Sequence, residues 1–121
     1  MVDPAIGKAV GSYLAELNLR GLPVAFGVVF GSHARGTSHA WSDIDLFVIS
    51  PRFDSKPLRS DVDLLWRTAA TTDPRIEPIG VGSRQWLEDD GIPLIEIVRR
   101  EGVIIRPEAG SCPPGRSGPE S

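Results

Sequence analysis

Near the start of the chain, apolar residues recur every three or four positions as far as Gly21. An Asp3-Pro4 pair precedes this stripe, and proline is favoured at the first position of a helix. The stripe consists of Ile6, Val10, Tyr13, Leu14 and Leu17. The spacing predicts an amphipathic helix that begins at Asp3 or Pro4 and ends before Gly21.

Two short stretches that follow are rich in apolar residues. Residues 24–30 contain only apolar side chains and glycine, which is typical of a strand covered on both faces. A second strand is expected over residues 43–50, because side chains of a strand alternate between its two faces. One face would carry Ile44, Leu46 and Val48, and the other Asp43, Asp45, Phe47 and Ile49.

The second half of the chain continues this alternation of helices and strands. A helical stripe is formed by Leu58, Val62, Leu65, Trp66 and Ala69. A third strand is predicted over residues 75–81, and Pro78 places it at a sheet edge or makes it irregular. Short helices over residues 83–89 and 92–100 and a last strand over residues 103–105 complete the pattern. The fold class expected is α/β (α+β), a small mixed β-sheet flanked by helices.

Length and composition limit the organisation of the chain. With 121 residues, 40 % of them hydrophobic, it can bury one core. We assign residues 1–106 to a single domain. Residues 107–121 are rich in proline, glycine and serine, and we expect them to form a disordered tail.

Charge and cysteine content exclude several functions. The net charge of −3 and a pI near 5.3 argue against an overall field that binds nucleic acid or anionic membranes. No apolar run approaches the ~20 residues needed to span a bilayer, and the start does not resemble a signal peptide. We therefore expect a cytoplasmic protein. Cys112, the only cysteine, argues against disulfide or zinc chemistry.

The turn after the first strand favours a bound phosphate. Gly31 lets the backbone approach a ligand, and Ser32 adds a hydroxyl beside free N–H groups. Arg35 and Ser42 are further candidates for nucleotide contact, although Arg35 could equally be an exposed turn residue. An ordinary strand-to-helix turn is the alternative interpretation of Gly31 and Ser32.

Asp43 and Asp45 point to a divalent cation. On a strand, their carboxylates share one face and lie about 6.5 to 7 Å apart. Two like charges at the end of an apolar strand repel, and a cation removes that penalty. Oxygen ligands favour Mg²⁺, with Mn²⁺ possible, over Zn²⁺. Glu77, on the next strand, is the candidate third carboxylate, as metal ligand or as base; a solvent-facing strand carboxylate is the alternative.

A similar segment elsewhere shows that Asp-x-Asp alone is weak evidence. Ser60-Asp61-Val62-Asp63-Leu64 nearly repeats Ser42-Asp43-Ile44-Asp45-Leu46. The second copy falls in the helical pattern, where residues two apart point in different directions. We interpret Asp61 and Asp63 as a solvated helix face.

Gly31-Ser32, ten further residues and Asp43-Ile44-Asp45 resemble the signature of the minimal nucleotidyltransferases of the DNA polymerase β superfamily. The likeness extends over most of residues 1–106. It implies the polymerase β-like nucleotidyltransferase fold, with ATP as substrate and Mg²⁺ as cofactor. It also implies phosphate contacts by Gly31 and Ser32, and metal binding by Asp43 and Asp45, with Glu77 as a less secure match.

The same resemblance implies a partner. Many members of the family act as antitoxins beside a helical HEPN-type toxin, which they adenylylate or bind. We therefore expect transfer of AMP from ATP to a hydroxyl of such a protein. The alternatives are a partner-binding antitoxin module with a vestigial nucleotide site, and nucleotidyl transfer to a small molecule such as an aminoglycoside.

Overall fold

The computed structural model describes residues 4–31, 43–54, 59–88 and 93–108 of the chain. In these ranges the elements follow in the order α1 (Pro4–Leu19), β1 (Phe26–Phe30), β2 (Ile44–Ser50), the 3-10 turn η1 (Pro51–Asp54), α3 (Arg59–Thr72), β3 (Ile76–Gly82), α4 (Ser83–Glu88), α5 (Pro93–Glu101) and β4 (Val103–Ile105). This order confirms the helices and strands that the sequence pattern predicts.

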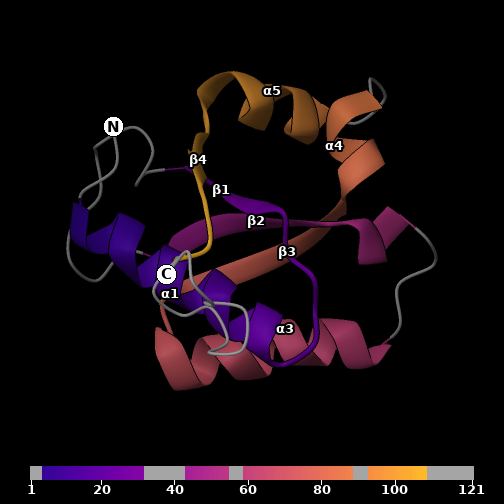
Figure 1. Ribbon diagram of the computed structural model, residues 1–121. Coiled ribbons are helices and arrows are strands. Elements are labelled where there is room, and N and C mark those ends of the chain that lie inside the picture. Colours follow the sequence, from indigo (N-terminus) through magenta and orange to yellow (C-terminus); the bar gives the residue numbers. More distant parts are fainter. Residues whose placement is uncertain (1–3, 32–42, 55–58, 89–92, 109–121) are drawn as a thin grey trace, which may run out of the picture.

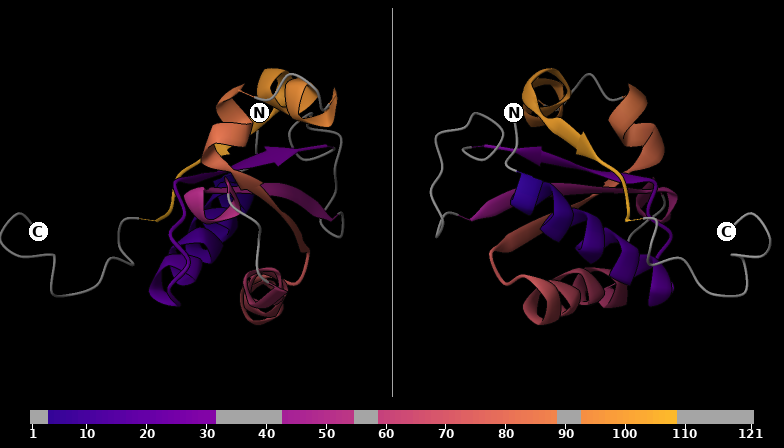
Figure 2. Two further views of the ribbon diagram at one scale, coloured as in Figure 1. Left: turned by 90° about the vertical axis from the view of Figure 1, so that its right-hand side faces the viewer. Right: turned by 60° about the vertical axis from the view of Figure 1, so that its left-hand side comes forward.

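The strands of the described residues form one mixed sheet in the order β3-β2-β1-β4. β1 is antiparallel to both of its neighbours, whereas β2 and β3 are parallel and are connected through α3. Helices α1 and α3 cover one face of the sheet, and α4 and α5 cover the other (Figure 1). The same three layers are seen edge-on in Figure 2. The architecture is the small mixed α/β fold that the sequence predicts.

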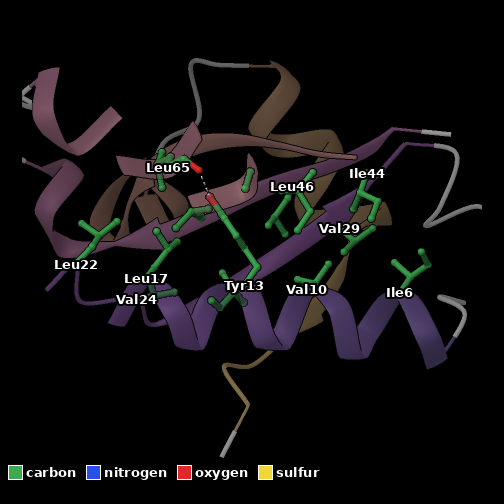
Figure 3. Packing of buried hydrophobic residues seen from close by; sticks show 14 of the residues in the cluster. Ile6, Val10, Tyr13, Leu17, Leu22, Val24, Val29, Ile44, Leu46 and Leu65 are labelled. Atoms are coloured by element: carbon green, nitrogen blue, oxygen red, sulfur yellow. Dashed lines mark hydrogen bonds between the residues drawn. The ribbon is translucent and has the colours of Figure 1, made fainter. Parts of the chain in front are cut away.

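Each face of the sheet has its own core because the side chains of β2 alternate as expected. Ile44, Leu46 and Val48 lie in the cluster beneath α1 and α3, whereas Phe47 and Ile49 lie in the cluster beneath α4 and α5. In the first cluster, Tyr13 of α1 donates a hydrogen bond from its hydroxyl to the Leu65 carbonyl at 2.9 Å (Figure 3). Burial raises the pKa of the Tyr13 phenol. Strand β2 is therefore central and largely buried.

The buried face of α3 differs from the predicted stripe. Val62 and Trp66 are 42 % and 50 % exposed, while Asp61 is buried at 6 % exposure beside Leu65. The predicted inward position of Val62 and Trp66, and the interpretation of Asp61 as solvated, are therefore wrong. Asp61 is tolerated there because Arg52 of η1 donates to it from Nη1 at 3.1 Å.

Pro78 lies on an edge strand, as predicted. Ile76, two residues before it, donates its N–H to Asp73 O, and Gly82 donates its N–H to Gln85 Oε1, at 3.0 and 3.2 Å. Alternate N–H groups of a strand point to the same side, so position 78 also points away from β2. The missing N–H of proline therefore costs no ladder hydrogen bond.

The described chain continues beyond β4 and contacts α1. The N–H of Glu108 donates to the Gly11 carbonyl at 3.0 Å, and the Ser12 hydroxyl donates to the Glu108 carboxylate at 3.2 Å. Most of the predicted disordered tail, residues 109–121, lies outside the described residues. No helix in the described ranges is long and apolar enough to cross a membrane.

Candidate functional site

The strand register gathers the predicted acidic residues at one end of the sheet. Phe30 of β1 pairs with Asp45 of β2, and Asp45 pairs with Glu77 of β3. Asp43 immediately precedes β2, and Gly31 immediately follows β1. Because β1 runs opposite to β2, its final residues lie beside the first residues of β2, and the parallel pairing of β2 with β3 places the first residues of β3 next to these.

Gly31 has a backbone conformation that suits glycine. Its φ is +78°, in the left-handed region that other residues rarely adopt. A side-chain carbon added there would lie 3.4 Å from Asp45 Cγ and would collide with Asp45 Oδ2. The turn therefore brings backbone and carboxylate together in a space that only glycine leaves open.

Three carboxylates influence one another at this end of the sheet. Hydrogen bonding to Asp43 is the main cause that raises the pKa of Glu77, followed by the charge of Asp43, slight desolvation and the charge of Asp45. Asp43 and Glu77 are exposed, whereas Asp45 is half-buried. Without a counter-charge, Glu77 therefore holds a proton more readily than an isolated glutamate does.

The donor set suits a hard divalent cation. Carboxylate oxygens are the ligands that Mg²⁺ prefers, and a cation would relieve the repulsion that raises the Glu77 pKa. Within the described ranges, however, no three His, Cys, Asp or Glu side chains are already gathered closely enough to hold a metal. Asp43, Asp45 and Glu77 are thus adjacent, and they would have to converge around a bound ion.

The predicted site residues divide into two groups. The structure brings Gly31, Asp43, Asp45 and Glu77 together at one end of the sheet, where β1 ends and β2 and β3 begin. The other candidates, Ser32, Arg35 and Ser42, lie outside the described residues.

Ile79 is a neighbour of the site that sequence reasoning did not single out. It lies two residues beyond Glu77 on the same face of β3, and 44 % of its surface is exposed. The spacing of two from Glu77 on a predicted edge strand is the signal that could have indicated it.

A hollow of about 550 Å³ lies at the opposite end of the sheet and is lined by Phe53, Asp54, Arg84, Gln85 and Glu88. Asp54 accepts hydrogen bonds there from the N–H groups of Arg84 and Gln85, and so caps the start of α4. These residues follow β2 and β3, whereas the carboxylates precede or begin these strands. The hollow is therefore separate from the acidic site.

The sequence profile of the nucleotidyltransferase domain family matches residues 12–100, and the chain therefore belongs to this family. No curated protein matches the chain.

Several solved structures are similar in fold, among them the following two. A candidate nucleotidyltransferase from Sulfolobus solfataricus has 16 % sequence identity and a TM-score of 0.59; the match covers 83 % of this chain and 78 % of that one. A toxin-antitoxin structure with AMP-PNP has 20 % identity and a TM-score of 0.53; the match covers 83 % of this chain and 75 % of that one. At these identities, the two structures support the fold alone.

Proposed function

We propose that this nucleotidyltransferase domain transfers AMP from ATP, with Mg²⁺ as cofactor, to a hydroxyl group of a partner protein. The observation that carries the proposal is that the turn at Gly31 lies close to Asp43, Asp45 and Glu77 at one end of the sheet. Membership of the nucleotidyltransferase family supports the reaction class.

Each residue has a role in this proposal. Asp43, Asp45 and Glu77 would hold the cation, which supplies positive charge for the phosphate oxygens and the leaving group. Gly31 and Ser32 would contact the phosphates, with Arg35 and Ser42 as further contacts. Gly31 suits this role because it lies beside the Asp45 carboxylate, so a cation held there would also be close to a phosphate at this turn.

The transfer is an in-line displacement at the α-phosphorus. The acceptor oxygen forms a bond to phosphorus as the bond to the pyrophosphate oxygen breaks, and pyrophosphate leaves with that electron pair. The acceptor hydroxyl loses its proton, and Glu77 is the proposed base because it is the acidic residue on the strand farthest from Gly31.

A protein acceptor is favoured by one comparison. A toxin-antitoxin structure is among the solved structures with the same fold. We propose a helical, HEPN-type toxin as the partner, following the family resemblance of the signature motif.

The test is transfer of label from ATP labelled at the α-phosphate. The reaction contains Mg²⁺ and the helical protein encoded by an adjacent gene. We expect the partner to be labelled by the wild type and not by Asp43→Asn/Asp45→Asn. Label at the γ-phosphate should not be transferred. Asp63→Asn, which changes an exposed aspartate on α3, is the matched control and should retain activity. Equal labelling by the double variant would show that the catalytic assignment is wrong.

A binding role without catalysis is the second candidate. It is favoured by the exposed positions of Asp43 and Glu77, which contribute little to packing, and by the absence of a preformed three-ligand cluster in the described ranges. In this case the double variant would bind and neutralise its partner as well as the wild type does.

A further inference from the structure

The face of the sheet beneath α4 and α5 carries two adjacent rows of residues. The first row, Phe30, Asp45 and Glu77, contains the acidic site. The second row is Val28, Phe47 and Ile79, one step further along each strand on the same face. The second row is entirely apolar, so an apolar strip runs beside the acidic row.

On β1, β2 and β3, one residue of this apolar row is open to solvent; Ile104 of β4, which pairs with Val28, continues the row at the opposite edge of the sheet. Val28 and Phe47 are each 1 % exposed, whereas Ile79 is 44 % exposed. Helix α5 packs against β1, and α4 packs against β3 further along, next to Val81, which is buried. Helices α4 and α5 therefore do not bury Ile79, and its apolar side chain is exposed beside Glu77.

The direction of the transfer reaction decides whether the nucleotide or the acceptor lies beside Ile79. The phosphates of the proposed nucleotide would lie at Gly31, on the β1 side of Asp45. In an in-line displacement, the entering and leaving groups approach phosphorus from opposite sides. With pyrophosphate departing on the β1 side, the acceptor enters on the β3 side, where Glu77 and Ile79 lie.

We propose that Ile79 is an acceptor-binding residue that selects a protein segment with an apolar side chain close to its reactive hydroxyl. This inference rests on the proposed nucleotidyl transfer and specifies its acceptor. A hydroxyl beside Glu77 and an apolar group on Ile79 would be separated by about 6.5 to 7 Å, the spacing of residues two apart in an extended chain. A polyhydroxylated sugar would instead place polar groups against the isoleucine, at a cost in desolvation.

Peptide binding tests this acceptor site independently of catalysis. Isoleucine methyl-labelled protein, loaded with Mg²⁺ and α,β-methylene-ATP, whose carbon bridge blocks transfer from the α-phosphorus, is titrated with two acetylated, amidated pentapeptides and followed by NMR. Both have a central serine flanked by glycines, with either leucine or asparagine at the two ends. We expect the leucine peptide to shift the Ile79 methyl resonance and to bind with a Kd about fivefold lower than that of the asparagine peptide.

Two substitutions show whether the preference depends on Ile79. Ile79→Ser should bring the ratio of the two Kd values close to one. Ile104→Ser should leave the ratio unchanged, because Ile104 is an isoleucine with 53 % exposure on β4, the opposite edge strand. The affinity for α,β-methylene-ATP, measured in parallel, should be the same in both variants and in the wild type.

The outcomes separate this inference from the proposed function. Equal affinities for the two peptides, no binding of either, or a preference lost in both variants would overturn the role of Ile79. Weaker binding of α,β-methylene-ATP in Ile79→Ser alone would make the residue a nucleotide contact and would also overturn it. Absence of label transfer by the wild type would instead reject the proposed function, while the peptide ratio would still measure the apolar selectivity.

Discussion

At the scale of single residues, the Glu77 carboxyl links acidity to stability. The Asp43 carboxyl and the Asp45 charge raise its pKa above the ordinary value of 4.5. The folded chain therefore binds this proton more tightly than the unfolded chain does. The corresponding stability is present below pH 4.5 and is lost as the pH rises through the raised folded value.

This linkage predicts the behaviour of Glu77→Gln. In EDTA the variant should have a higher Tm than the wild type at pH 7, because it removes one of three repelling charges. The difference in Tm should shrink as the pH falls toward 4.5. Adding Mg²⁺ should stabilise the wild type more than the variant. Thermal unfolding followed by circular dichroism measures these differences, with Glu96→Gln on α5 as an exposed control; a pH-independent difference would contradict the prediction.

Gly31→Ala should damage the site and the fold together. A left-handed conformation costs a residue with a side chain ~1–2 kcal/mol, and the new carbon would also collide with Asp45 Oδ2. Gly21→Ala is a matched control, because Gly21 has φ +99° but nothing within 4 Å of an added carbon. We expect both variants to lose stability in urea unfolding and only Gly31→Ala to lose nucleotidyl transfer. Full activity of Gly31→Ala would refute the close-approach argument.

Residue spacing was enough to place Gly31, Asp43 and Asp45 near one another, because they lie at the ends of two strands that follow each other in the chain. Their roles in binding a nucleotide and a metal stay predictions. Glu77 could also be proposed, because it is a lone acid in an apolar strand. The burial of Asp61, in contrast, could not be predicted from residue spacing. Its burial depends on Arg52, which lies in a different element and approaches only after folding.

At the scale of elements, α3 is fixed by the contacts around Arg52. This side chain donates to Asp61 Oδ1 and also to the Gly21 carbonyl, both at 3.1 Å. It thereby connects η1 with the start of α3 and with the turn after α1. Among the residues that the structure describes, Asp61 Oδ2 has no hydrogen-bond partner, so the pair is only partly satisfied.

Asp61→Ala should therefore destabilise the protein, because it leaves Arg52 without its carboxylate partner. We expect a loss of about 1–2 kcal/mol in the free energy of unfolding, less than for a fully buried pair because Arg52 is 41 % exposed. Asp63→Ala, on the exposed side of the same helix, should change it by less than about 0.5 kcal/mol. Urea denaturation compares the two, and equal losses would contradict the role assigned to Arg52.

The predicted helical stripe of α3 was wrong in detail because apolar spacing alone could not choose between neighbouring faces. Val62 and Trp66 share a face at positions i and i+4, but the face that packs contains Leu65, Thr68 and Ala69. Pairing of Asp61 with Arg52 makes that orientation possible. The helix itself could be predicted, whereas its rotation depended on a tertiary contact.

At the scale of the whole molecule, strand order decides whether the site exists. The sequence indicates four strands, and Pro78 indicates that β3 lies at an edge. The pairing of β2 with β3 in parallel, across α3, could not be derived, because it depends on contacts between distant segments. This pairing places Glu77 beside Asp45.

The overall charge predicts weak interaction with nucleic acid. A chain with a net charge of −3 and an acidic site should not gain affinity from release of phosphate counterions. We expect no binding of a 20-base-pair duplex, about two helical turns, at physiological salt when measured by fluorescence anisotropy, with or without Mg²⁺. Tight, salt-dependent binding would reveal a basic surface and would contradict this prediction.

The exposed position of Glu77 has an evolutionary consequence. Its side chain fills no part of either core, so under the proposed function a mutation there would abolish the chemistry and leave the shape of the protein intact. Descendants of such a domain could lose turnover in a single step and still be recognised by their partners. Enzymes and inert binders with this architecture would then differ at a handful of surface acids rather than in their folds.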